Sequence, residues 1–227
     1  MDSIKTKAIV LRRTNYGEAD RILNILTPVG KMSVMAKGVR KTKSKLAGGI
    51  ELFCVSDVVV HRGKGDLGVL TSARLQEFYG EIMKDLLAME FVGEVLKEVS
   101  RRAEQVDIPE YFDLVWQVLW GMNELLKVGE CEKLWLVQAW WELNVLRVSG
   151  EEINLRMDVD GAKLLVERRY VWDAMERAMR ESINGEICSE HVKLMRLMAS
   201  SPLRLVLKVR EVTKLEGGVK GVLRSFS

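Results

Sequence analysis

The hydrophobic period of this chain changes near residue 80, and that change limits the folds open to it. Before Gly80, short runs of β-branched and apolar residues alternate as they do in half-buried strands. After Gly80, apolar residues recur about every 3.6 residues, the period of an amphipathic helix. We therefore predict an α+β chain with two domains, a β domain over residues 1–80 and an α-helical domain over residues 81–227.

Five strand-like runs lie in the first 80 residues, and glycine-containing turns separate them. The runs are Lys7–Arg13, Arg21–Thr27, Met32–Lys37, Phe53–Arg62 and Leu67–Leu75. Five short strands with glycine-rich connections are typical of a small closed barrel rather than an open sheet. An OB-fold β-barrel is the natural candidate at this size.

Three helices are predicted to follow and to form a bundle. The first, over residues 82–103, is apolar around most of its circumference. The second starts at a capping pattern of Asp107, Pro109 and Glu110 and ends by Gly129. The third runs from about residue 130 to residue 150. Five of the six tryptophans lie on the second and third helices, and we expect their rings to fill a core; they are Trp116, Trp120, Trp135, Trp140 and Trp141.

The last third of the chain has weaker signals. Alternating apolar residues around Asp160–Gly161 predict a short hairpin insert near residues 150–169. A helix containing Trp172, Met175 and Met179 is expected next. The stretch 200–215 starts like a helix at Ser201 and Pro202 but also alternates like a strand. We predict a helix there.

The sequence contains no run of 18 apolar residues, and its first twenty residues lack the apolar core of a secretory signal. Its three scattered cysteines, Cys54, Cys131 and Cys188, are typical of a reducing compartment rather than of a disulfide framework. We therefore expect a cytoplasmic, nucleoid-associated protein without a membrane partner.

Charge is unevenly distributed along the chain. The formal net charge is +3, but residues 1–80 hold 14 Lys and Arg against 7 Asp and Glu, whereas residues 81–227 hold 21 against 25. A basic module favours polyanions. The charge split therefore favours nucleic acid as the partner of the β domain.

The densest basic stretch lies between the third and fourth predicted strands. Five cations fall within nine residues, and no acid follows until Glu51; they are Lys37, Arg40, Lys41, Lys43 and Lys45. We expect a conformationally loose loop whose cations contact DNA phosphates. The alternative is a solvated surface loop, but clustered like charges repel and are costly without an anionic partner.

Other basic residues of the β domain are candidates to extend this surface. They are Arg12, Arg13, Arg21, Lys31, Arg62, Lys64 and Arg74. Tyr16 and Phe53 are available to stack on bases, although lone aromatic residues beside a barrel more often pack in its core.

Motifs for chemistry are weak. The stretch Gly63–Gly68 matches a dinucleotide-binding pattern, but strand-like residues follow it where a helix is needed, so a hairpin loop is the better interpretation. Cys188 and His191 have the spacing of half a zinc site, without the other half. His61 has no nucleophile near it in the sequence. We expect neither an enzyme nor a cofactor, zinc included.

The first 80 residues resemble the RecO recombination mediators of bacterial DNA repair. The stretches that carry the resemblance are Ala8–Thr27, Gly30–Phe53 and Arg62–Leu75, in the family's order and spacing. The resemblance implies an N-terminal OB-fold and a helical domain that together bind single- and double-stranded DNA and anneal complementary strands. It also implies interaction with single-stranded DNA-binding protein and with RecR, and help in loading the RecA recombinase.

Many members of that family carry a four-cysteine zinc module after the third helix, and this chain has no cysteine pair there. The alternative function is that of a protein-interaction adaptor, in which the helical domain carries the main role and the barrel has little affinity for DNA.

Overall fold

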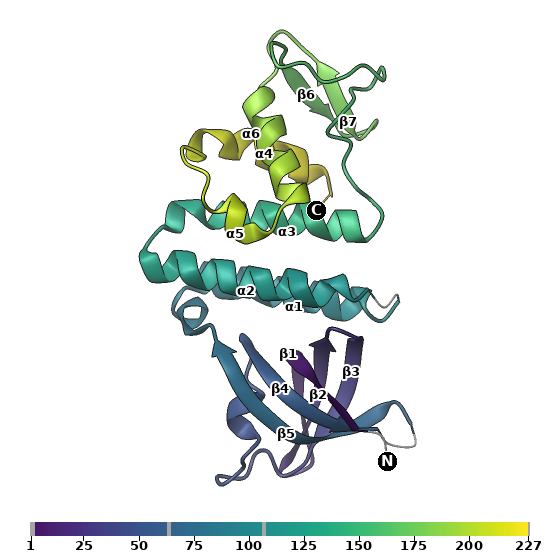
Figure 1. Ribbon diagram of the computed structural model, residues 1–227, viewed down its shortest axis with the longest axis vertical. Helices are drawn as coiled ribbons and strands as arrows, with labels where there is room; N and C mark the ends of the chain where they lie inside the picture. The colour runs from purple at the N-terminus through teal and green to yellow at the C-terminus, as the bar shows by residue number, and fades with distance from the viewer. Residues whose placement is uncertain (1–2, 63–64, 106–107, 227) are drawn as a thin grey trace. The chain divides into compact units, whose positions relative to one another are not determined.

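The computed structural model describes residues 3–62, 65–105 and 108–226. The chain divides into two compact units, residues 1–127 and residues 128–227. The first unit holds five strands followed by two long helices, and the second holds shorter helices and a hairpin (Figure 1). The predicted α+β class is confirmed. The first two helices group with the strands, whereas the sequence places a domain boundary at residue 80; that boundary stays a prediction.

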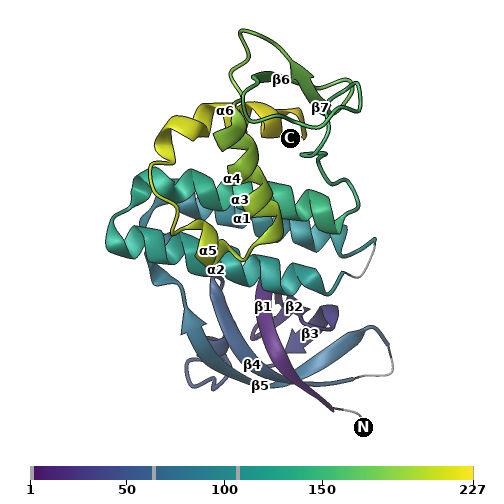
Figure 2. The same cartoon turned by 45° about the horizontal axis from the view of Figure 1, so that its top comes forward.

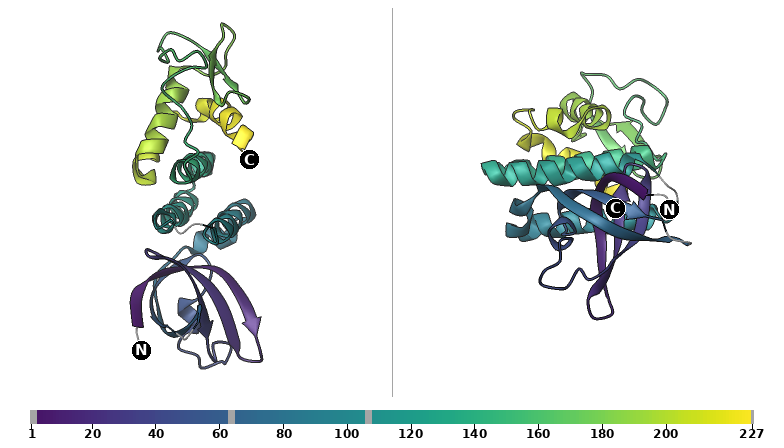
Figure 3. Two further views of the ribbon diagram at one scale, coloured as in Figure 1. Left: turned by 90° about the vertical axis from the view of Figure 1, so that its right-hand side faces the viewer. Right: turned by 60° about the horizontal axis from the view of Figure 1, so that its bottom comes forward.

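The five strands of the first unit form a closed barrel in the order β1-β2-β3-β5-β4. They are β1 (Ser3–Tyr16), β2 (Asp20–Thr27), β3 (Gly30–Ala36), β4 (Cys54–His61) and β5 (Leu67–Phe78). All neighbours are antiparallel except β3 and β5, which pair in parallel. The left view of Figure 3 looks into the barrel. Each strand-like run of the sequence corresponds to one of these strands, although Lys37, Phe53 and Arg62 at the ends of two runs lie just outside them.

Alternation along the strands explains the barrel core. One side chain in two points inward, as with Val10, which is paired with Ile25 of β2. Register shifts, after Val10 in β1 and at two places in the β4–β5 pair, give the local bends that closure requires. The inward apolar residues form one cluster: Ala8, Val10, Leu23, Ile25, Val34, Ala36, Val39, Ile50, Val58, Val60 and Leu70. The buried Ser56 of β4 pairs in register with Ala8.

The segment between β3 and β4 contributes to this core. Val39 and Ile50 are buried within the cluster, and a short 3-10 helix, Ala47–Gly49, lies between them. Gly49 rests on β5 so closely that a Cβ there would lie 2.7 Å from the carbonyl carbon and oxygen of Ala73. Only glycine permits that approach without a shift of one of the two backbones.

Two helices complete the first unit: α1 (Leu86–Arg102) and α2 (Glu110–Val128). They lie side by side (Figures 2 and 3). The sequence predicts a helix from residue 82, but residues 80–84 form a 3-10 helix and α1 begins after Asp85. The Asp85 carboxylate accepts a hydrogen bond of 2.8 Å from the Ala88 amide, which satisfies a free donor at the helix start. Asp107 of the predicted cap lies outside the described residues.

The second unit is built on α3 (Leu134–Val148), which lies within the predicted third helix. It packs against α4 (Ser189–Ser200), α5 (Leu203–Val206) and α6 (Glu216–Leu223). Asn144 is buried in this core and donates to the carbonyls of Trp140 and Met198, at 2.8 and 3.0 Å. The buried rings of Trp135, Trp140 and Trp141 confirm the core prediction for α3, whereas Trp116 and Trp120 of α2 are only half-buried.

The predicted helix around Trp172, Met175 and Met179 is wrong. The chain forms an antiparallel hairpin of β6 (Tyr170–Asp173) and β7 (Ala178–Glu181). Asp173 decides the turn, because its carboxylate accepts hydrogen bonds of 3.0 Å from the amides of Met175 and Glu176. Such local side-chain bonds compete with helix formation.

Two further expectations for this unit are met only in part. At residues 158–161 a turn forms, with Gly161 at a φ of +78°, but the described flanks join only in one isolated bridge, Met157 with Lys163. Of the predicted helix over 200–215, the four residues of α5 and the 3-10 helix Thr213–Leu215 are helical. Glu211 takes a φ of +54°, which a continuous helix does not allow.

Candidate nucleic-acid interface

The loop after β3 displays the five clustered cations. Lys37, Arg40, Lys41, Lys43 and Lys45 are all exposed. Within the described parts of the chain, none of them forms an ion pair. Five positive charges thus face solvent without internal neutralisation.

The first half of this loop is fixed in place. The Gly38 amide donates a 2.6 Å hydrogen bond to the Asp20 carboxylate, and Gly38 has a φ of +64° that favours glycine. The Arg40 amide donates to the Ala19 carbonyl at 2.9 Å, and its guanidinium donates to the Gly17 carbonyl at 3.1 Å. With Val39 buried beneath, the loop is anchored to the β1–β2 turn, so the expectation of a loose loop is wrong for these residues.

The other candidate cations are not gathered into a single surface. Arg13 forms an ion pair with Glu51, and Arg21 donates to the Asn15 side chain at 3.2 Å. Arg74 of β5 pairs in register with Asp57 of β4. Arg62 lies at another hollow, beside β3, and Lys64 lies outside the described residues.

Lys31 is ion-paired within the protein and does not present a free charge. Its side chain is only 11% exposed, and the ammonium donates to the Ser100 carbonyl at 2.9 Å and to the Glu104 carboxylate at 2.7 Å. This contact joins β3 to the last turn of α1. Lys31 lowers the pKa of Glu104, chiefly through that hydrogen bond. Lys31 therefore does not extend the exposed basic surface.

The two aromatic candidates separate clearly. Tyr16, at the end of β1, is 55% exposed. Phe53 is 6% exposed, so its ring packs inside the protein. Of these two candidates, Tyr16 is the one with an exposed ring.

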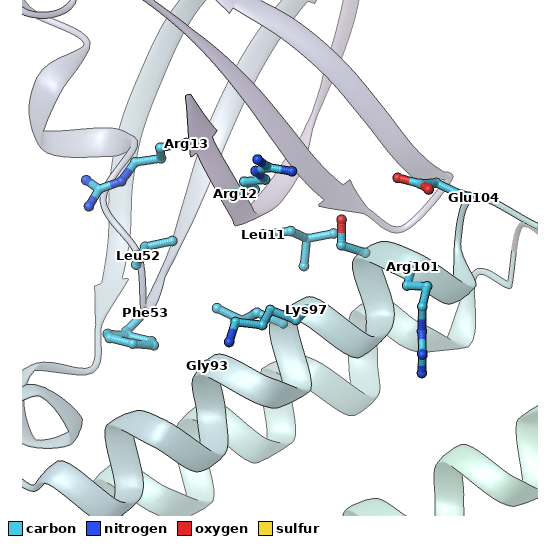
Figure 4. Close-up of a pocket in the computed structure, with 11 residues that line it drawn as sticks. Leu11, Arg12, Arg13, Leu52, Phe53, Gly93, Lys97, Arg101 and Glu104 are labelled. Carbon is cyan, nitrogen blue, oxygen red and sulfur yellow. The ribbon is translucent and has the colours of Figure 1, made fainter. Parts of the chain in front are cut away.

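A groove of about 650 Å³ lies between β1, the end of the β3–β4 segment and α1. Its floor is apolar, and both rims carry cations. The lining residues are Leu11, Arg12, Arg13, Leu52, Phe53, Gly93, Leu96, Lys97, Ser100, Arg101 and the acidic Glu104. Figure 4 shows Arg12 and Arg13 on the strand side and Lys97 and Arg101 on α1, with the Arg101 side chain directed away from the strands. The helix cations were missed from the sequence, where Lys97 and Arg101 look like an ordinary solvated helix face.

The half zinc motif has a local structural role. Cys188 caps the start of α4, and the His191 imidazole Nδ1 accepts a 3.2 Å hydrogen bond from the Cys188 amide. Burial lowers the pKa of His191. Among the described residues, no group of three or more His, Cys, Asp and Glu is placed to hold a metal. The expected absence of zinc stays a prediction.

The chain matches known proteins along its whole length. A family model described as recombination protein O N terminal matches residues 1–79. A DNA repair protein RecO from Heliobacterium modesticaldum is 30% identical over 231 aligned residues, which cover 98% of this chain and 81% of that protein.

The chain belongs to the RecO family. Another DNA repair protein RecO, from Dehalococcoides mccartyi, is 39% identical over 155 residues, which cover 67% of this chain and 58% of that relative. One from Alkaliphilus metalliredigens is 32% identical and is covered over 60% of its length. The chain thus spans less than two thirds of the length of these two relatives. The RecO resemblance predicted from the first 80 residues is confirmed.

The matched RecO segment ends one residue after β5, so it includes the complete barrel and the anchored basic loop. Lys97 and Arg101 lie beyond it, on α1. In the part of the chain that the structure describes, no helix is both long and apolar enough to cross a membrane.

Proposed function

We propose that this chain is a recombination mediator that binds DNA through its barrel, which we assign to the OB type. The closed five-stranded order, with β3 and β5 parallel, supports that assignment. Lys37, Arg40, Lys41, Lys43 and Lys45 contact phosphates, with little preference for sequence because phosphates carry no base information. Arg12, Arg13, Arg21, Arg62, Lys64 and Arg74 are secondary contacts in this proposal.

One observation carries the proposal: five exposed cations without ion-pair partners in the described chain sit on a loop that is anchored by Gly38, Val39 and Arg40. An anchored loop loses less conformational entropy on binding than a free one. The anchored first half of the loop, which carries Arg40 between Lys37 and Lys41, therefore presents its charges at low entropic cost.

Annealing follows from the same chemistry. Two complementary strands repel each other through their phosphates, and a basic surface that neutralises both backbones without covering the bases lets them pair. We propose that the chain anneals single strands, binds double strands, and helps to load recombinase. Single-stranded DNA-binding protein and RecR are its proposed partners, and neither zinc nor catalysis is involved.

The test is the fluorescence anisotropy of a labelled single-stranded oligonucleotide, titrated with the protein at several salt concentrations. Five phosphate contacts predict a slope of log affinity against log salt of about −3.5. Replacing the five loop cations with Ala should flatten the slope and weaken binding at least a hundredfold at low salt. Both Kd values and an annealing rate are measured for each protein.

A matched control removes five exposed cations from the second unit: Lys193, Lys208, Arg210, Lys214 and Arg224. It changes the net charge equally, so we expect it to keep most of the affinity. Equal losses in the two variants would show that net charge, not the loop, holds DNA. Undetectable binding by the unchanged protein at low salt would reject the proposal and favour a protein-interaction adaptor.

A further inference from the structure

The groove beside α1 has an unusual helical residue at its edge. Gly93 lies in the middle of α1 and lines the groove. A Cβ built on Gly93 meets no atom within 4 Å. Glycine is the poorest helix former after proline, and here no neighbour requires its small size. The space next to the α1 backbone is therefore open in a place where alanine fits.

The floor of the groove is apolar, and cations outnumber acids among its lining residues: Arg12, Arg13, Lys97 and Arg101 against Glu104, which is already paired with Lys31. Leu11, Leu52, Leu96 and Phe53 line the floor. On the strand rim Arg12 is exposed, and its charge acts on Glu104, which lines the same groove and is ion-paired with Lys31. On the helix rim Lys97 forms an exposed ion pair with Glu94, which a stronger anionic partner can replace.

The groove continues into a polar row on the outer face of the barrel. Arg12 of β1 pairs in register with Asn24 of β2, and Asn24 pairs with Ser33 of β3. The Ser33 hydroxyl donates to the Asn24 side chain at 3.1 Å. Ser33 also lines the second hollow, which holds Arg62. That hollow has mixed charge, with Lys31 and Arg62 beside Asp66 and Glu104, and Arg62 is its exposed cation. The polar row thus leads from Arg12 at one end to Arg62 at the other.

We propose that the groove receives an unpaired base of a single DNA strand, with its flanking phosphates on Arg12 and Lys97. This inference rests on the proposed DNA-binding function and adds selectivity for single strands. The apolar floor gives a base face van der Waals contact, and the open backbone at Gly93 leaves room for the base edge. Bases of a duplex are stacked and paired and do not enter. The spaced phosphates of a strand match Arg12 and Arg62, at the two ends of this row, better than an isolated acidic peptide segment does.

The test is a substitution that fills the groove. Gly93→Leu places a branched side chain in the open space on a residue type that favours helix. We expect affinity for a single-stranded oligonucleotide to fall about tenfold, the loss of one base contact. Affinity for a blunt duplex of the same length should change less than twofold, because the basic loop is untouched.

Two controls accompany it. Gly221→Leu adds the same side chain to a helical glycine of α6 that also has no atom within 4 Å of its Cβ position, and should leave both affinities unchanged. Arg12→Ala keeps the groove open but removes one phosphate contact, and should reduce the single-strand salt slope by about 0.7. Circular dichroism and a thermal melt establish that each variant is folded.

Unchanged single-strand affinity in both Gly93→Leu and Arg12→Ala, with tight binding by the unchanged protein, would overturn the inference while leaving the proposed function standing. Equal losses for single strand and duplex would also overturn it, because the groove would then contact only backbone. Unchanged DNA binding, together with a labelled acidic peptide that binds the unchanged protein but not Gly93→Leu, would assign the groove to a protein partner.

Discussion

The indole Nε1 of Trp116 donates a hydrogen bond of 2.7 Å to the hydroxyl of Tyr79. Tyr79 follows the last barrel strand, and Trp116 lies on α2, so this contact joins the barrel to its second helix. The Tyr79 hydroxyl in turn donates to the Glu77 carboxylate. The Lys7 ammonium lies 4.7 Å from the centre of a Trp116 ring, a cation–π contact.

Removing the indole donor should loosen this junction. Trp116→Phe keeps an aromatic ring but loses the bond to Tyr79, and we expect the free energy of unfolding to fall by about 1–3 kcal/mol. Tyr79→Phe should cost a similar amount. The double variant should cost less than the sum, because both changes break the same bond. Urea denaturation of the three variants measures the coupling, and strict additivity would contradict the proposed network.

Tyr79 should also affect stability at high pH. Burial and the neighbouring Glu77 raise its pKa well above the ordinary value of 10.0. The unfolded chain therefore ionises this hydroxyl before the folded one does, and stability is lost as pH rises above about 10. Tyr79→Phe should show a smaller loss between pH 9 and pH 11 than the unchanged protein. An equal loss in both proteins would assign the effect to other groups.

The ion pair between Lys31 and Glu104 should make the stability of the protein depend on pH in the acid range. Lys31→Met removes the hydrogen bonds to the Ser100 carbonyl and to Glu104, and should lower stability at neutral pH. The pKa of Glu104 is lowered in the folded state, so its contribution is present above the unfolded value of 4.5 and is lost as pH falls through the folded value. The stability difference between the two proteins should shrink below about pH 4. Thermal melts from pH 3 to pH 7 measure it, with Lys97→Met as an exposed control.

The barrel was predictable from the sequence because its signals are local. Period-two runs such as Arg21–Thr27, bounded by glycine turns, specify strands one at a time. The hairpin of β6 and β7 could not be predicted in the same way, because Trp172, Met175 and Met179 also fit the apolar stripe of a helix. The Asp173 turn that overrides this pattern depends on side-chain hydrogen bonds that spacing does not reveal.

The candidate site could likewise be predicted only in part from the sequence. The exposed cations of the β3–β4 loop follow from their density in the sequence. Two contacts depend instead on the tertiary fold. Arg40 is anchored to Gly17 and Ala19, and Lys31 bonds to Glu104 across 73 positions of the chain. The groove at Gly93 is likewise formed by segments far apart in the chain, so no local motif marks it.

Two neighbouring glycines of the 3-10 helix between β3 and β4 should differ in their response to alanine. Gly49→Ala places a Cβ 2.7 Å from the Ala73 carbonyl, so we expect a loss of about 1–3 kcal/mol in unfolding free energy. Gly48→Ala meets no atom within 4 Å and should be nearly neutral. Urea denaturation compares them. Equal stability of the two variants would contradict the close packing of the 3-10 helix on β5.

Asp20 tests whether the basic loop is held in place. Asp20→Ala removes the acceptor of the Gly38 amide, so the loop should open more often. Because trypsin cleaves after Lys and Arg, the rate of cleavage within residues 37–45 measures that opening, and we expect it to rise about fivefold, a change of about 1 kcal/mol in the opening equilibrium. Asp20→Asn retains the acceptor oxygen and removes only the charge, so its cleavage rate should stay near that of the unchanged protein. If all three proteins are cut equally fast, the Asp20 contact does not restrain the loop, and the entropic part of the argument for DNA binding fails with it.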